Sequence, residues 1–164
     1  MDQVDADAAA RAAGVPVGTI NVWIQRRLLP GVEVGSRGKS RSFSVDDVLH
    51  LAVMAALVRI GIASPLASAA AELCRRDNNW RKLNAVLTIG PSDDTRLGGP
   101  VYEQYVVSGE ALRPEQWLSG FYKRPEGYVT VELFRLVKRV EDFLAAETAK
   151  ADAPPTATKD NTER

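Results

Sequence analysis

The stretch of sequence that decides the fold reads AAARAAGVPVGTINVWIQRRLLP (8–30), GVEVGSRGKSRSF (31–43) and SVDDVLHLAVMAALVRIGI (44–62). Its first part predicts a short helix from about Asp5 to Ala13, because alanine is the best helix former. Gly14 follows, where the end of a helix favours a residue that adopts positive φ. Pro16 is tolerated in a first helical turn, so a second helix is expected directly after a tight turn.

This second helix is predicted to run from about Val17 to Arg27. Apolar residues recur in it at spacings of three and four, which gives the helix one apolar stripe. Pro30 and Gly31 end it. The residues of the stripe are Val17, Ile20, Ile24 and Leu28.

A basic hairpin is predicted next. Two short strands, Val32 to Val34 and Ser40 to Phe43, flank the sequence GSRG at 35–38, whose glycines allow a tight return. Its tip is compact and cationic, which suits contact with phosphates or with a minor groove. Residues 11–43 hold six cations and one anion, so positive charge concentrates on the second helix and the hairpin. A solvated loop and helix face is the alternative interpretation.

These segments resemble the MerR family of winged helix-turn-helix DNA-binding proteins over roughly the first 75 residues. Three positions depart from the family pattern: Asn21 replaces the usual Arg, Val22 the first Tyr, and Arg27 the Gly. Trp23 stands where the family has its second Tyr. The positions that carry the resemblance are Ala10, Gly14, Val15, Thr19, Ile20, Leu28, Leu29 and Pro30 in the first two helices, Gly38, Arg41, Phe43 and Ser44 in the wing, and Asp46, Asp47 and Val48 after it.

The resemblance implies an α+β, mainly α fold, with an N-terminal winged helix-turn-helix whose second helix enters the major groove. It also implies double-stranded DNA as partner, a homodimer, and RNA polymerase as a further candidate partner. The expected DNA-binding residues are Pro16, Val17, Thr19, Asn21, Trp23, Gln25, Arg26, Arg27, Arg37, Lys39, Ser40 and Arg41.

Two of these residues have alternative interpretations. Asn21 is an eligible base reader, because asparagine binds adenine bidentately, but it is equally a solvated helix residue. Trp23 could lie against a sugar-phosphate strand, but packing under the wing as part of the core is the favoured alternative.

A longer helix follows, with Ser44 as its N-cap and two acids in its first turn. It is apolar around most of its circumference, which predicts the central core helix. His50 on it is expected to be a packing or surface residue. The next helix, Ser64 to Arg76, should bury Leu66, Ala69, Ala70 and Leu73, with Cys74 as a small buried apolar residue. Arg75, Arg76, Arg81 and Lys82 form a second basic cluster, either a flanking DNA contact or a solvated helix end.

Beyond residue 78 the sequence favours β-structure. Strands are predicted at 85–89 and 101–107, and 128–131 is a candidate third strand, which gives a small antiparallel sheet of two or three strands. An aromatic cluster of Trp117, Phe121 and Tyr122 is expected to cover one face of it. This part is either an effector-binding module or a platform that supports a dimer, and the platform is preferred because no convergent set of acids, thiols or histidines is present.

An amphipathic helix is predicted from Glu132 to Ala146, and a disordered, Pro- and Thr-rich tail follows. The helix could pack on its own sheet or on the same helix of a second subunit. Its predicted dimerisation stripe is Leu133, Leu136, Val137, Val140, Phe143 and Leu144. The expected domains are residues 1–78 (DNA-binding), 79–149 (sheet and helix, dimerisation or effector module) and 150–164 (tail).

The composition of the chain limits the classes of function that are expected. The 164 residues carry a net charge of zero, which argues against a coat protein for nucleic acid but not against a site-specific binder. No stretch is apolar enough to span a membrane, no signal peptide is expected, and the one cysteine cannot form an internal disulfide, so a cytoplasmic location follows. One His, one Cys and no nucleotide loop or paired-ligand spacing argue against an enzyme, a cofactor or a metal site.

The sequence therefore favours a sequence-specific transcriptional regulator. Two alternatives stay open: an excisionase-like or phage architectural protein that bends DNA for recombination, and a protein-interaction adaptor with a degenerate winged helix.

Overall fold

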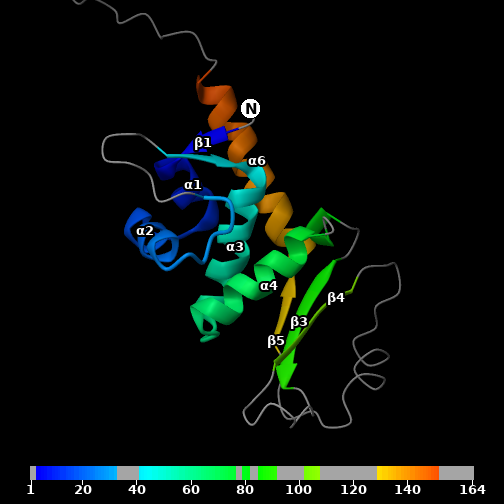
Figure 1. Cartoon of the computed structure of the whole chain (residues 1–164). Helices are drawn as coiled ribbons and strands as arrows, with labels where there is room; N and C mark the ends of the chain where they lie inside the picture. Colours follow the sequence, from blue (N-terminus) through cyan, green and yellow to red (C-terminus); the bar gives the residue numbers. More distant parts are fainter. Residues whose placement is uncertain are drawn as a thin grey trace, which may run out of the picture.

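The computed structural model describes residues 3–32, 41–76, 79–81, 85–91, 102–107 and 129–151. Helices form the N-terminal part, and a small sheet lies beyond α4 at one end of the molecule (Figure 1). The elements are β1 (Gln3–Asp5), α1 (Ala6–Ala13), α2 (Val17–Gln25), β2 (Ser42–Ser44), α3 (Val45–Arg59), α4 (Ser64–Arg76), the 3-10 helix η1 (Asn79–Arg81), β3 (Val86–Pro91), β4 (Tyr102–Val107), β5 (Val129–Glu132) and α6 (Leu133–Ala151).

The core is built around α3, as the sequence predicted. Its N-terminus is closed by a reciprocal capping box: the Ser44 hydroxyl accepts from the Asp47 amide at 3.2 Å, and the Asp47 carboxylate accepts from the Ser44 amide at 3.0 Å. Residues on almost every side of α3 are buried, because α1, α4 and α6 all contact it. This helix therefore connects the N-terminal and C-terminal parts of the chain.

A strand precedes the first helix, where the sequence predicted no element. This strand, β1, pairs antiparallel with β2 and sets Val4 opposite the fully buried Phe43. Asp5 then caps α1, since its carboxylate accepts from the Ala8 amide at 2.7 Å. The predicted strand at 40–43 is thus found at Ser42–Ser44 with the N-terminus as its partner, and residues 33–40 of the wing lie outside the described residues.

The predicted antiparallel sheet is confirmed, and it has three strands. Its order is β4-β3-β5, and Thr88 in the middle strand stands opposite Tyr105 and Thr130. Leu87 and Ile89 are buried, which seals one face of β3 against the helices. The predicted aromatic cluster at 117–122 lies outside the described residues.

The apolar stripe of α6 packs within its own chain. It contacts α1, α3, η1 and β3, so the interpretation of this stripe as a dimerisation seam is wrong for the residues it buries. Five of its six residues are at most 8% exposed, and the sixth, Phe143, is half-buried below Arg11 with 6.0 Å from the guanidinium carbon to the ring centroid. The helix also runs five residues beyond its predicted end at Ala146, where Arg11 pairs with Glu147 at 2.6 Å. The buried members are Leu133, Leu136, Val137, Val140 and Leu144.

In α4 the buried face is turned from its predicted position. Ala69 is exposed, while Ser68 faces inward and donates to the Leu28 carbonyl at 2.7 Å. Leu66 and Leu73 are half-buried, and Ala70 and Cys74 are buried as predicted. The face turns because α4 covers the turn after α2 as well as α3. Burial raises the pKa of the Cys74 thiol to about 12, so it is an unreactive packing residue.

The second basic cluster joins elements of the structure. Arg75 donates to the Asp47 carboxylate at 3.2 Å and to the Pro30 carbonyl at 3.1 Å. Arg81 bridges Asp46 at 2.9 Å and Glu141 at 3.6 Å. Two of the four cations are therefore held by acids of the same chain rather than presented to a partner, and Lys82 lies outside the described residues.

His50 is fully buried beside this network. Neither ring nitrogen has a hydrogen-bond partner among the described residues, and the nearest carboxylate oxygen, of Glu72, is 3.9 Å from Nδ1. Burial, reinforced by the charge of Arg75, lowers the pKa of His50 to about 4, although the Leu28 carbonyl and Asp47 act in the opposite direction. The imidazole is therefore neutral in the folded protein at neutral pH.

We expect His50 to make stability depend on pH. In the unfolded chain its pKa is near 6.5, so between pH 6.5 and 4 the unfolded state binds a proton that the folded state does not. The contribution of His50 to the free energy of unfolding is complete above pH 6.5. It is lost as the pH falls toward 4, and the total loss is about 3 kcal/mol. Urea unfolding of the wild type and of His50→Leu at pH 7.5, 6 and 5 measures it. Parallel curves for the two proteins would contradict the prediction.

None of the helices in the described part of the chain combines the length and the apolar content needed to cross a membrane.

Candidate nucleic-acid interface

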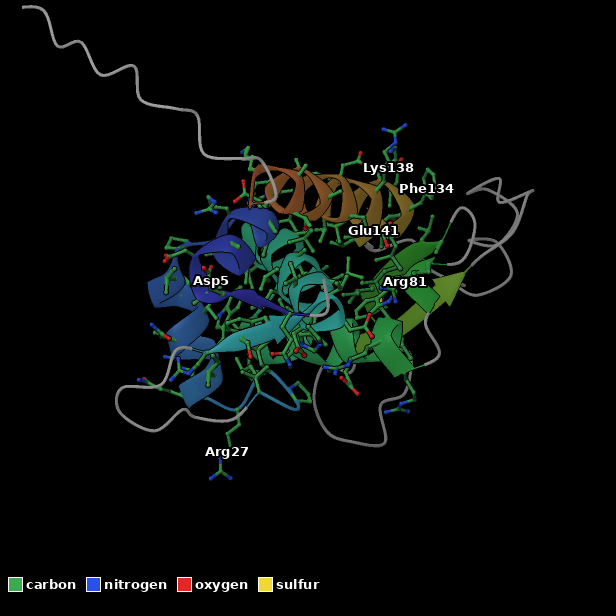
Figure 2. The ribbon with its side chains drawn as sticks, turned by 90° about the horizontal axis from the view of Figure 1, so that it is seen from above. Asp5, Arg27, Arg81, Phe134, Lys138 and Glu141 are labelled. Atoms are coloured by element: carbon green, nitrogen blue, oxygen red, sulfur yellow. The ribbon has the colours of Figure 1, made fainter. Side chains whose placement is uncertain are left out.

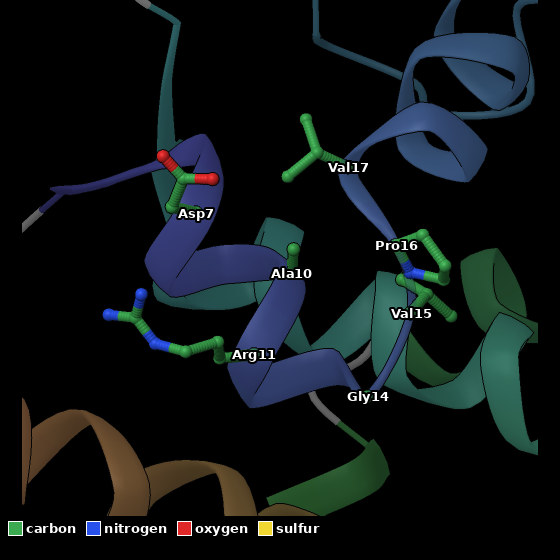
Figure 3. A pocket seen from close by; sticks show the side chains of 7 residues that line it. All are labelled: Asp7, Ala10, Arg11, Gly14, Val15, Pro16 and Val17. Atoms are coloured by element: carbon green, nitrogen blue, oxygen red, sulfur yellow. The ribbon is translucent and has the colours of Figure 1, made fainter.

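A tight turn joins α1 to α2. Gly14 has a φ of 72°. The amides of Gly14 and Val15 both donate hydrogen bonds to the Ala10 carbonyl, at 2.9 and 3.0 Å. Pro16 is the N-cap of α2, and no side chain caps the amides of its first turn. The turn leaves a shallow hollow of about 390 Å³ between α1 and α2. Figure 3 shows Arg11 of α1 and Val17 of α2 among the side chains that line it. The N-terminus of α2 therefore has no side-chain cap, and its dipole favours an anion there, whereas the Asp7 carboxylate that also lines the hollow opposes one.

The second helix has one buried and one exposed face. Ile20, Trp23 and Ile24 are at most 4% exposed. The predicted contact of Trp23 with DNA is therefore replaced by its alternative, a core position. Gly18, Val22 and Gln25 form the outward face, and Val22 is 42% exposed. Val22 is not among the predicted DNA-binding residues, although its position one helical turn after Gly18 places it on the same face of the helix.

A hydrogen bond connects α2 to the end of the wing segment. Arg41 Nη1 donates to Asn21 Oδ1 at 2.5 Å, and both side chains are half-buried. Arg41 Nε is buried and finds no partner in the described part of the chain. Asn21 is therefore bonded to the wing segment rather than fully solvated, and its contact with a base stays a prediction. The contact places the second helix and the start of β2 on one side of the molecule.

Two exposed arginines end the second helix. Arg26 is its C-cap, and Arg27 has a φ of 56°, a left-handed conformation that glycine adopts without strain. Leu29 then returns to the core. In Figure 2 the side chain of Arg27 extends away from the body of the protein, on the side opposite α6. The arginine at position 27 therefore provides an outward cation at the cost of a strained backbone.

Among the other predicted site residues, Pro16 and Gln25 are exposed, and Val17 and Thr19 are half-buried at the start of α2. Arg37, Lys39 and Ser40 lie outside the described residues, so their contacts stay predictions. Arg11, one of the six cations between residues 11 and 43, pairs with Glu147 of α6.

The strain at position 27 leads to a prediction. We expect Arg27→Gly to raise the free energy of unfolding by about 0.5–1 kcal/mol, because glycine removes the penalty of the left-handed conformation. The same substitution should weaken DNA binding, because one exposed cation is lost. Urea unfolding and gel shifts on the same preparations measure both effects.

Arg26→Gly is the matched control. Arg26 has a φ of −82°, so glycine relieves no strain there and should lower stability by about 0.5–1 kcal/mol. If both glycine variants changed stability in the same direction, the strain at Arg27 would not be the cause.

Comparison with known proteins identifies this region. Residues 5–71 match the family model described as MerR HTH family regulatory protein. This segment is therefore a MerR-like helix-turn-helix DNA-binding region, and the match supports a DNA-binding regulator in general. No curated protein matches the chain.

Proposed function

We propose that the chain is a sequence-specific transcriptional regulator of MerR-like type that binds double-stranded DNA through α2 and the wing. The observation that carries this proposal is the contact between Arg41 and Asn21, which joins the two predicted DNA-binding segments on one side of the molecule. Arg26 and Arg27 add exposed positive charge to the end of α2.

The proposed contacts fall into two groups. Phosphates would be bound by Arg26 and Arg27, by the wing residues 37–40, and by the amides of Val17 and Gly18 at the start of α2, which no side chain caps. Base edges would be reached by the outward face of α2, which carries Gly18, Val22 and Gln25. Affinity would thus depend mostly on the phosphate group, and specificity on the outward face.

The homodimer and the contact with RNA polymerase are further proposals that rest on the resemblance to the MerR family. The apolar stripe of α6 is buried within the chain, so a second copy would have to meet another surface. Analytical ultracentrifugation across a concentration range tests the homodimer.

Genomic footprinting of the tagged protein, followed by gel shifts on the recovered duplex at 50 and 200 mM salt, tests the function. We expect one discrete site that spans promoter elements, and binding that weakens on the order of a thousandfold between the two salt concentrations. Footprints on several direct repeats near an attachment site would instead indicate recombination. No footprint, and no shift even at the lower salt concentration, would exclude DNA binding and leave a role as a protein adaptor.

A further inference from the structure

The outward face of α2 is centred on an apolar side chain. Val22 is 42% exposed and points away from the buried stripe of Ile20, Trp23 and Ile24. Gly18 lies four residues earlier and so on the same face. A Cβ placed on Gly18 would meet nothing within 4 Å. The surface of α2 is therefore open at Gly18, one helical turn before Val22, which allows a close approach to a groove there.

The chemistry of the major groove limits what Val22 can bind there. Base edges in this groove present hydrogen-bond donors and acceptors, and the one exposed apolar group is the C5-methyl of thymine. An aliphatic side chain that replaces water at this methyl gains free energy, whereas one pressed against a polar base edge gains nothing and displaces hydrating water. A valine at the centre of a recognition face therefore discriminates in favour of thymine.

The nearest polar candidate on α2 is already engaged. A bidentate contact with adenine uses the amide oxygen as acceptor and the amide nitrogen as donor. The oxygen of Asn21 accepts from Arg41 at 2.5 Å, and this bond holds the half-buried amide against the wing segment. Asn21 therefore links α2 to the wing, whereas Val22 is exposed on the outward face of α2.

We propose that Val22 is a specificity-determining residue that reads the C5-methyl of a thymine in the bound site. This inference rests on the proposed DNA-binding function. It assigns a role to a position at which the chain departs from the MerR pattern and for which the sequence predicted no contact.

Replacing thymine by deoxyuridine tests it, because this removes only the methyl group. In the footprinted duplex each thymine is replaced in turn, and the affinities of wild type and Val22→Ala are measured by fluorescence anisotropy. For the wild type we expect one thymine in each bound half-site at which deoxyuridine weakens binding about fourfold, the effect of one buried methyl. For Val22→Ala the same replacement should have no effect.

Two further variants serve as controls. Val22→Thr keeps the shape of the side chain and one of its methyl groups, so it should retain part of the preference for thymine. Phe134→Ala removes a large side chain that is 47% exposed on α6, far from Arg27 in Figure 2, and should bind like wild type. Circular dichroism confirms that each variant is folded.

Three outcomes would overturn the inference. Equal effects of deoxyuridine on wild type and Val22→Ala at every thymine would show that Val22 contacts no methyl group. No effect at any thymine would show the same. If the wild type bound no DNA at all, the proposed function would fail first, and the inference with it. The first two outcomes leave DNA binding intact, so the two failures are distinguishable.

Discussion

Removal of four cations from the proposed interface is expected to weaken DNA binding on the order of a thousandfold at 100 mM salt. The variant combines Arg26→Gln and Arg27→Asn in α2 with Arg37→Gln and Lys39→Gln in the wing. Asparagine tolerates the left-handed backbone at position 27, and Arg41 is retained because it holds Asn21. Each lost phosphate contact also removes about 0.9 from the slope of log K against log salt, so the slope should fall by about three to four per protein chain.

The control removes the same charge elsewhere. Arg135, Lys138, Arg139 and Lys150 are exposed on α6, and their replacement by glutamine changes the net charge equally. Figure 2 shows Lys138 on the side of the molecule away from Arg27. We expect the affinity of this control to fall less than tenfold, through long-range attraction alone, which salt screens. Equal losses in the two variants would mean that net charge, and not a shaped interface, attracts the DNA.

The elements that could be predicted from the sequence are those with local signals. Gly14 and Pro16 give the turn between α1 and α2 directly, because each restricts the backbone at its own position. Ser44 and Asp47 form the expected N-terminus of α3, since both halves of a capping box lie three residues apart. The sheet follows in the same way from runs of β-branched and aromatic residues between turns.

What could not be predicted depends on partners distant in the sequence. An apolar stripe at helical spacing shows that one face of α6 is buried, but it does not say against what, and the answer is α1 and α3 rather than a second copy. The bond from Arg41 to Asn21 spans 20 residues. The pairing of β1 with β2 spans about 40. These contacts depend on which distant segments of the chain pack together, and a local sequence pattern does not contain that information.

Trp80 is the strongest case of a residue without a local signal, and its removal should cost the most stability. It lies in the short η1 segment, is 1% exposed, and η1 contacts both α4 and α6. We expect Trp80→Ala to lower the free energy of unfolding by about 3–5 kcal/mol, because the lost burial is accompanied by a cavity. Guanidinium unfolding, monitored by far-UV circular dichroism, measures it.

The matched control is Phe134→Ala. Phe134 and Trp80 both line a hollow between η1 and α6, but Phe134 is 47% exposed. Its removal should therefore lower the free energy of unfolding by less than about 1 kcal/mol.

Because η1 joins α4 to α6, and α6 contacts α1 and α3, we expect the Trp80 variant to unfold in one transition that also abolishes DNA binding. Two transitions, with DNA binding lost only in the second, would instead mean that the segments before and after residue 78 fold independently, as the predicted domain boundary implies.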